Sequence, residues 1–180
     1  MQYTHIIVGA GSAGATLAAR LTERDDTQVL LIEAGPDYRS ADTPAAMSSA
    51  NPSEIITGAN YQQFRYPELL AKRTIAQDAL LYWRGRGLGG SSAINGQIAI
   101  RGVPADYDIW AEEGCEGWSY NEVLPYFNRL ETDLRFGAAA YHGDSGPIPI
   151  YRASLNQWGP VDRVLGEGAL DLGYEWAADH

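Results

Sequence analysis

The segment GAGSAG at residues 9–14, which stands between two apolar stretches, most constrains the fold of this chain. Residues 3–8, YTHIIV, are β-branched and apolar, as expected of a strand buried in a parallel sheet. Residues 15–24 carry apolar side chains at helical spacing, and residues 27–35, TQVLLIEAG, again have the composition of a buried strand. The order strand, glycine turn, helix, strand predicts a βαβ unit with a right-handed crossover.

Gly9, Gly11 and Gly14 have the G-x-G-x-x-G spacing of a dinucleotide-binding turn. In such a turn Gly9 permits the sharp bend, Gly11 lets a pyrophosphate approach the backbone, and Gly14 lets helix and strand pack closely. A helix beginning near Ser12 directs free N–H groups and its positive dipole end at the phosphate. Glu33, at the end of the second strand, can accept both ribose hydroxyls of an adenosine and repels a 2′-phosphate. NAD or FAD is therefore predicted rather than NADP.

The chain becomes irregular after this unit. Pro, Ser, Asn and Asp interrupt residues 36–78, where we expect excursions and short helices, and residues 79–85 regain a strand-like composition. Residues 103–132 predict two short helices, the second with Ser119 as its N-cap. Two further elements are expected toward the C-terminus: a turn and strand over 141–151, and a helix over 161–176.

A second glycine segment, GRGLGGSSAINGQIAIRG, occupies residues 85–102. A flexible linker would be padded with polar residues, whereas Leu88, Ile94 and Ile98 stand among these glycines. Bare backbone held by apolar side chains suits a large flat ligand such as an isoalloxazine ring. Three polar side chains in the segment could hydrogen-bond a phosphate or a ring edge: Ser91, Ser92 and Asn95.

FAD thus accounts for both glycine segments. An NAD-dependent dehydrogenase is an alternative that explains residues 9–33 but leaves residues 85–102 without a role. A glycine-rich packing turn without any ligand is the other alternative for the second segment.

These motifs together resemble the glucose–methanol–choline (GMC) family of flavin oxidoreductases. The second glycine segment, continued to Asp108, fits the first signature of that family, and THIIVGAGSAG and VLLIEAG resemble its ADP-binding half. Residues 101–127 and 141–150 resemble the stretches that follow in choline-dehydrogenase-like members. The resemblance covers essentially the whole chain. It implies an α/β, Rossmann-like FAD-binding domain with α+β excursions over residues 1–150, itself incomplete, and the start of a substrate-binding domain over 151–180.

The resemblance also implies which residues contact the cofactor. The first glycine segment would hold the pyrophosphate, the end of the second strand the adenosine, and the second glycine segment the flavin phosphate and ring, with one aromatic residue nearby. In that order the residues are Gly9, Gly11, Ser12, Ala13 and Gly14; Glu33 and Ala34; Ser91, Asn95, Gly96, Gln97 and Ile98; and Tyr61. Some family members attach FAD covalently through a histidine in the signature. Residues 79–102 contain no histidine, so non-covalent FAD is expected.

For activity, the resemblance implies oxidation of the CH–OH group of a small-molecule alcohol, by hydride transfer to flavin N5. Oxygen, a quinone or another carrier would then accept the electrons. The family uses a His paired with a second His or Asn near the C-terminus as its base, and none of the three histidines here matches that position. The pair is therefore expected beyond residue 180, and His142 is expected to be a structural turn residue. The alternative is a non-catalytic FAD-binding fragment or subunit that needs a separate C-terminal polypeptide.

Composition removes several other classes of function. A net charge of −10 and a pI near 4.6 disfavour nucleic-acid and anionic-membrane partners. Cys115 is the only cysteine, which excludes an intrachain disulfide and a multi-cysteine metal site, and no metal is expected. The sequence has neither a run of about 18–20 apolar residues that would span a bilayer nor a basic signal-peptide start, so a cytoplasmic protein is expected.

Overall fold

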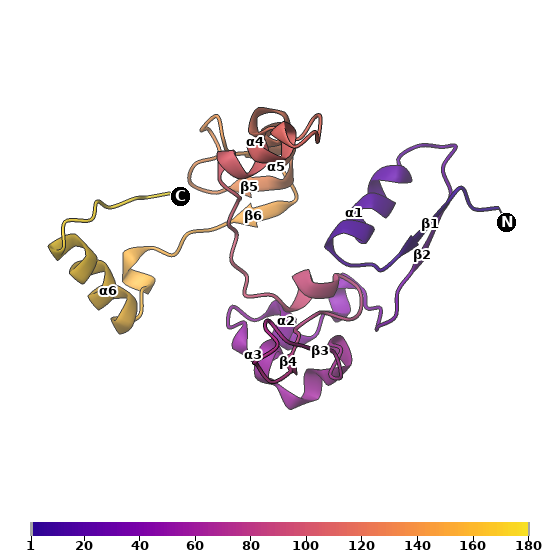
Figure 1. Ribbon diagram of the computed structural model, residues 1–180, viewed down its shortest axis with the longest axis horizontal. Helices are drawn as coiled ribbons and strands as arrows, with labels where there is room; N and C mark the ends of the chain where they lie inside the picture. The colour runs from indigo at the N-terminus through magenta and orange to yellow at the C-terminus, as the bar shows by residue number, and fades with distance from the viewer. Residues whose placement is uncertain (1, 180) are drawn as a thin grey trace. The chain divides into compact units, whose positions relative to one another are not determined.

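The computed structural model describes residues 2–179, and its internal contacts divide the chain into two compact units, Met1–Ile98 and Ala99–His180 (Figure 1). The first unit contains both candidate cofactor-binding segments apart from the last four residues of the second. Each unit has its own small set of helices and strands.

The first unit begins with the predicted βαβ motif. Strands β1 (His5–Val8) and β2 (Val29–Ile32) pair in parallel, with His5 opposite Val29 and Val8 opposite Ile32, and helix α1 (Ser12–Leu21) connects them (Figure 1). Ile7 is buried, while Ile6 and Val8, whose side chains point to the opposite face of the strand, are exposed. The motif is confirmed, with strands shorter than the apolar stretches that predicted them.

Short elements fill the rest of this unit, as expected for the irregular stretch. Strands β3 (Leu70–Ala71) and β4 (Leu80–Leu81) pair antiparallel. The strand expected over residues 79–85 is thus reduced to two residues, and Gly85 forms only an isolated bridge, with Arg65. The helices are α2 (Ala45–Ser48), α3 (Ser53–Thr57) and the 3₁₀ turns Ser40–Asp42, Ala59–Phe64 and Gly90–Ile94.

A small apolar core lies under these short helices. Its buried members are Ala46, Ile55, Phe64 and Ile94. Ile94 therefore anchors the second glycine segment to the core, as predicted. Ile98 does not, because its side chain is 75% exposed. The backbone beyond Asn95 has left the 3₁₀ turn and runs without regular structure, so the expectation that Ile98 packs this segment is wrong for the residues described here.

The second unit contains helix α4 (Pro104–Glu112), helix α5 (Tyr120–Leu130) and the parallel strand pair β5 (Glu131–Asp133) and β6 (Ile148–Ile150). A 3₁₀ turn (Leu155–Gln157) and helix α6 (Pro160–Asp171) follow. Ser119 is the N-cap of α5 as predicted, and the Glu122 carboxylate accepts its backbone N–H at 3.1 Å.

Aromatic rings of α4 and α5 pack against one another in edge-to-face contacts. The centroid of Tyr107 lies 5.6 Å from those of both Trp110 and Phe127.

None of the helices within residues 2–179 has the length and apolar character needed to cross a membrane. The division into a cofactor domain over 1–150 and a substrate domain over 151–180 stays a prediction.

Candidate cofactor-binding site

The first glycine segment makes a sharp turn out of β1. Gly9 has a φ of +95°, in the region that favours glycine, and its N–H donates to the Ile32 carbonyl at 2.7 Å. A Cβ atom placed on Gly14 would lie 1.9 Å from the Gly9 carbonyl oxygen. Only glycine at position 14 therefore lets α1 begin so close to the strand, which confirms the close packing predicted from the spacing.

Helix α1 begins at this turn with no side chain covering its N-terminus. Gly11 is the N-cap, no side chain caps the helix, and the first turn has no acidic residue. A Cβ on Gly11 would meet only the Gly90 Cα, at an ordinary 3.8 Å. The first backbone N–H groups of a helix have no partner within the helix. This end of α1 has the character of an anion site, and backbone can approach an anion closely there.

The second glycine segment lies backbone to backbone against the first. The Gly89 N–H donates to the Ala10 carbonyl at 2.9 Å, and Gly89 and Gly11 form a parallel bridge. Gly90 has a φ of +51°, and a Cβ there would lie 2.8 Å from the Gly11 Cα. Within the second segment, a Cβ on Gly85 would lie 2.1 Å from the Gly90 carbonyl oxygen. These glycines are required by contacts between main chains, which is a role that the sequence did not indicate.

Glu33 joins the two segments through its carboxylate. Oε2 accepts the Ala10 N–H at 2.7 Å, and Oε1 accepts the N–H groups of Gly35 and Gly87, both at 2.9 Å. Burial by itself would raise the pKa of Glu33, but the backbone N–H donors outweigh it and hold the pKa below its ordinary value. Glu33 is therefore an ionised carboxylate at neutral pH.

Serine side chains reinforce the same junction. The hydroxyl of Ser12, at the start of α1, contacts the hydroxyl of Ser92. Ser91 accepts the Gly85 N–H at 3.0 Å through its Oγ. The Ala34 carbonyl accepts a hydrogen bond of 2.9 Å from Arg86. The predicted residues Ser12, Ala34 and Ser91 are thus brought together around the two glycine segments.

The remaining predicted residues continue away from this junction. The Asn95 Oδ1 accepts the Gln97 N–H at 2.8 Å, on the two sides of Gly96. Gln97 has a φ of +56°, and its amide donates to the Ser49 carbonyl at 2.8 Å. Tyr61 packs against the core, with its ring centroid 6.4 Å from that of Phe64, and Ala13 is exposed on α1.

Comparison with known proteins decides the family. A model of the GMC oxidoreductase family matches residues 3–179. This chain belongs to the GMC oxidoreductase family. Membership confirms the resemblance drawn from the two glycine segments, and with it the Rossmann-like α/β class of the fold.

Individual relatives of this GMC chain agree with the assignment. It is 46% identical over 179 residues to an oxygen-dependent choline dehydrogenase of Pectobacterium atrosepticum, covering 97% of this chain and 30% of that protein. The crystal structure of pyridoxine 4-oxidase from Mesorbium loti superposes with a TM-score of 0.82 at 32% identity, covering 97% of this chain and 33% of that one. An FAD-dependent oxidoreductase from Chaetomium thermophilum gives a TM-score of 0.75 at 30% identity, covering 96% and 30%. The chain spans about 30% of the length of the curated relatives it matches.

A buried arginine, Arg65, follows the 3₁₀ turn Ala59–Phe64 and forms a bridge with Gly85 at the start of the second glycine segment. Arg65 is 5% exposed, and its guanidinium donates to the carbonyls of Ile55 and Gly58 at 3.1 and 3.0 Å. The same guanidinium lies 4.7 Å from the ring centroid of Trp83. Nothing in the local sequence distinguishes Arg65 from an ordinary surface arginine, so sequence reasoning missed it.

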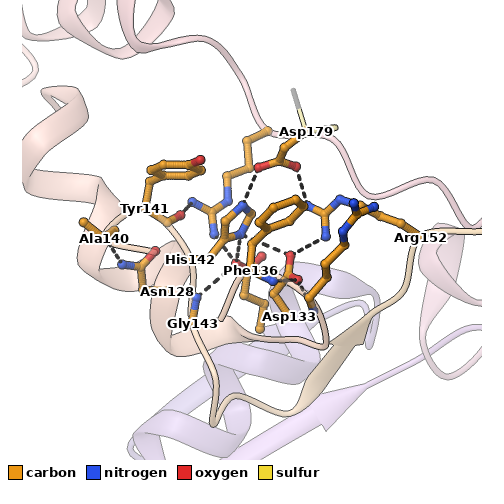
Figure 2. A network of polar contacts seen from close by, with 12 residues as sticks. Asn128, Asp133, Phe136, Ala140, Tyr141, His142, Gly143, Arg152 and Asp179 are labelled. Carbon is orange, nitrogen blue, oxygen red and sulfur yellow. Dashed lines mark hydrogen bonds and ion pairs between the residues drawn. The ribbon is translucent and has the colours of Figure 1, made fainter. Parts of the chain in front are cut away.

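In the second unit, His142 lies in an ionic network that the sequence also did not indicate (Figure 2). His142 Nδ1 lies 2.6 Å from Glu131 Oε1, and its Nε2 lies 2.7 Å from Asp179 Oδ2. Asp179 also pairs with Arg152, as Figure 2 shows. Among the residues that the structure describes, ion pairs join Arg101, Glu131, Asp133, His142, Arg152 and Asp179, and the charges of these six side chains balance when His142 is protonated.

The pKa shifts in this network follow from its hydrogen bonds. Burial alone would lower the pKa of His142, but hydrogen bonds to Asp179 and Glu131 outweigh it and raise the pKa above its ordinary value. Burial would raise the pKa of Asp133, but the Phe136 N–H and Arg152 dominate and lower it to about 2. The two carboxylates therefore favour the protonated form of His142.

Three of these groups also have the spacing of metal ligands. Donor atoms of Glu131, Asp133 and His142 lie within 4.8 Å of one another. The carboxylates, however, already form ion pairs, Glu131 with the Arg101 guanidinium at 2.7 Å and Asp133 with that of Arg152 at 2.6 Å. Because guanidinium groups supply the positive charge that a metal ion would bring, we assign the three residues to the ionic network.

Proposed function

We propose that this chain supplies the FAD-binding part of an oxidoreductase that oxidises the CH–OH group of a small-molecule alcohol. The junction of the two glycine segments is the observation that carries the proposal, because it sets a helix N-terminus without a side-chain cap beside bare backbone. The two relatives named for choline and pyridoxine support the substrate class, since both compounds carry a hydroxyl group.

In this proposal each part of the junction holds a different part of FAD. The N–H groups at the start of α1 bind the pyrophosphate, and the end of β2 meets the adenosine. The second glycine segment lines the flavin phosphate and ring, with Tyr61 nearby. The proposed contacts, in that order, are Gly9, Gly11, Ser12, Ala13 and Gly14; Glu33 and Ala34; and Ser91, Asn95, Gly96, Gln97 and Ile98.

The chemistry of hydride acceptance belongs to the flavin when it is bound. The residues of this chain bind and orient. The dipole of α1 offsets pyrophosphate charge, and ionised Glu33 repels a 2′-phosphate. Because residues 79–102 contain no histidine, we propose that FAD is held without a covalent bond.

We assign no residue of this chain as the catalytic base. His142 is engaged at both ring nitrogens by carboxylates, which supports a structural role and not proton transfer. The catalytic His/Asn pair is proposed to lie in sequence beyond residue 180. The engagement of both His142 ring nitrogens also favours a second candidate function, a non-catalytic FAD-binding subunit that is completed by a separate polypeptide.

The first experiment is an absorbance spectrum of the natural protein that carries this chain, purified without added flavin. The two visible bands of an oxidised flavin, released into the supernatant by acid precipitation, are expected. A colourless protein that stays colourless after incubation with FAD contradicts the proposal. A coloured precipitate would retain FAD binding and overturn only the non-covalent attachment.

Reduction by alcohols then separates the two candidate functions. Bleaching of the flavin by a primary alcohol without oxygen supports the oxidoreductase. A bound flavin that no alcohol in a panel of choline, sugar, aryl and aliphatic alcohols bleaches favours the non-catalytic subunit. Readmitting oxygen, or adding a quinone, identifies the electron acceptor by which of them restores the colour.

A further inference from the structure

We propose that Glu33 is a positioning residue, whose carboxylate fixes the second glycine segment against the first and thereby sets the flavin-binding half of the site. This inference rests on the proposed function in one respect, the identity of the cofactor as FAD. The loop-joining role itself rests on contacts within the first unit.

The carboxylate joins three separate pieces of backbone. Its partners are the N–H groups of Ala10, which lies 23 residues before it in the chain, Gly35, and Gly87, which lies 54 residues after it. Ala10 is 1% exposed and Gly87 is also buried, so water cannot replace the carboxylate at those two N–H groups without a change in the loops.

These three contacts also leave few hydrogen-bonding positions of the Glu33 carboxylate for a ligand. A carboxylate offers about four lone-pair positions, and three of them are taken by backbone donors. One position remains for a ribose hydroxyl. Most of the hydrogen bonding of Glu33 is therefore directed at the loops, and the same three donors, together with the backbone N–H of Ala34, lower its pKa.

The backbones around Gly35 and Gly87 are too close together to accommodate a neutral amide at position 33 without moving. A Cβ on Gly35 would lie 2.3 Å from the Gly87 nitrogen, so the backbones are nearly in contact beside the carboxylate. A glutamine presents an NH₂ group where Glu33 presents an oxygen, and two N–H donors would then face each other. The second glycine segment would have to shift away from the first.

The second glycine segment has other links to the rest of the first unit that do not involve Glu33, so the fold should survive its substitution. The Leu88 N–H donates to the Pro36 carbonyl at 3.0 Å, and the Gly89 N–H donates to that of Ala10. The Tyr38 hydroxyl donates to the Leu88 carbonyl at 3.1 Å. Loss of Glu33 is therefore expected to loosen residues 85–90 without unfolding the unit.

The test compares Glu33→Gln with Glu23→Gln in the natural protein that carries this chain. Glu23 makes an exposed ion pair with Arg20, and such pairs contribute little to stability. Two quantities are measured for each protein: the affinities for ADP and FAD, and the rate at which trypsin cuts the cofactor-free protein after Arg84 and Arg86, with the cleavage sites identified by mass spectrometry.

For Glu33→Gln we expect FAD affinity to fall by about tenfold or more, since a charged group loses several hydrogen bonds. The affinity for ADP, which lacks the flavin half, should fall by a smaller factor. Cleavage after Arg84 and Arg86 should accelerate, while Glu23→Gln matches the unsubstituted protein in both measurements.

The opposite pattern overturns the inference. Equal losses for ADP and FAD, with unchanged cleavage, would mean that Glu33 acts only at the ribose. If Glu33→Gln does not fold, Glu33→Asp is judged by the same two measurements, because it keeps the charge and shortens the reach of the carboxylate. If the unsubstituted protein does not bind FAD, the proposed function fails, and the cleavage comparison alone still decides whether Glu33 joins the loops.

Discussion

The carboxylate of Asp133, which is fully shielded from solvent, accepts a hydrogen bond of 2.6 Å from the guanidinium of Arg152, 19 residues later in the chain. Asp133 ends β5, and Arg152 follows β6 by two residues, so this bond ties together the ends of the two parallel strands. The other Asp133 oxygen accepts the N–H groups of Arg135 and Phe136. One buried carboxylate thereby fixes both the strand pair and the turn that follows β5.

Replacing Asp133 with asparagine is expected to destabilise the second unit by about 2–4 kcal/mol, because it leaves Arg152 without its buried partner charge. The change in the free energy of unfolding is measured by urea denaturation of the natural protein. Asp26→Asn is the matched control, since Asp26 pairs with Arg24 on the surface, and its effect on the free energy of unfolding should be much smaller. Equal effects of the two substitutions contradict the prediction.

The same carboxylate is expected to contribute to the loss of stability in acid. The pKa of Asp133 is lowered to about 2, from an ordinary value of 3.8. Its stabilising contribution is therefore complete above about pH 4 and is lost as the pH falls toward 2. Acid unfolding monitored by circular dichroism should be shallower over this range in Asp133→Asn. An acid limb of the same slope in both proteins would show that other carboxylates control it.

Between pH 6 and pH 9, His142 is expected to contribute to the pH dependence of stability. Its pKa is raised by Asp179 and Glu131, so its contribution is complete below the ordinary value of 6.5 and is lost as the pH rises through the pKa of the folded protein. The free energy of unfolding should decrease from pH 6 to pH 9, and His142→Gln should flatten that decrease. His5→Gln, at an exposed histidine on β1, should retain it. Retention of the full slope in His142→Gln is the contrary result.

At the cofactor junction, Gly11→Ala is expected to abolish FAD binding without loss of stability. The new Cβ meets only the Gly90 Cα at 3.8 Å, and the φ of −76° at Gly11 suits alanine, so the fold has room for the methyl group. That methyl group would stand where the pyrophosphate is proposed to approach. Cofactor content after purification and the thermal unfolding midpoint are the two measurements.

Substitutions at two further glycines serve as comparisons for Gly11→Ala. Gly14→Ala should unfold the first unit, because its Cβ would lie 1.9 Å from the Gly9 carbonyl oxygen. Gly168→Ala, inside α6 with nothing within 4 Å of the added atom, should leave cofactor content unchanged and stabilise the protein by roughly 0.5–1 kcal/mol. Normal FAD content in Gly11→Ala would remove the pyrophosphate from this turn.

The parts of the fold that follow from short sequence separations could be predicted. The G-x-G-x-x-G turn predicts the βαβ motif because strand, turn and helix are adjacent in the chain. Ser119 predicts the start of α5 because its capping partner Glu122 is three residues away. Apolar periodicity overestimated the lengths of strands, since it reports composition and not pairing.

Contacts between distant residues could not be predicted in this way. Glu33 has the position of a ribose-binding acid, yet its observed partners include a backbone N–H 54 residues away, and no local pattern encodes that pairing. Asp133 and Arg152 each resemble ordinary surface charges in the sequence. Ile98 resembled a packing residue because apolar character alone does not say which way the backbone turns after Asn95.

The separation between Glu33 and Gly87 also has a consequence for synthesis on the ribosome. At about 5–20 residues per second, roughly 3–11 s pass after Glu33 is made before Gly87 exists. During that time the residues of the βαβ motif have been synthesised, but the Glu33 carboxylate lacks the last of its three backbone partners. The carboxylate that joins the turn at residues 9–14 to the second glycine segment therefore gains its last backbone partner only after residue 87 has been translated.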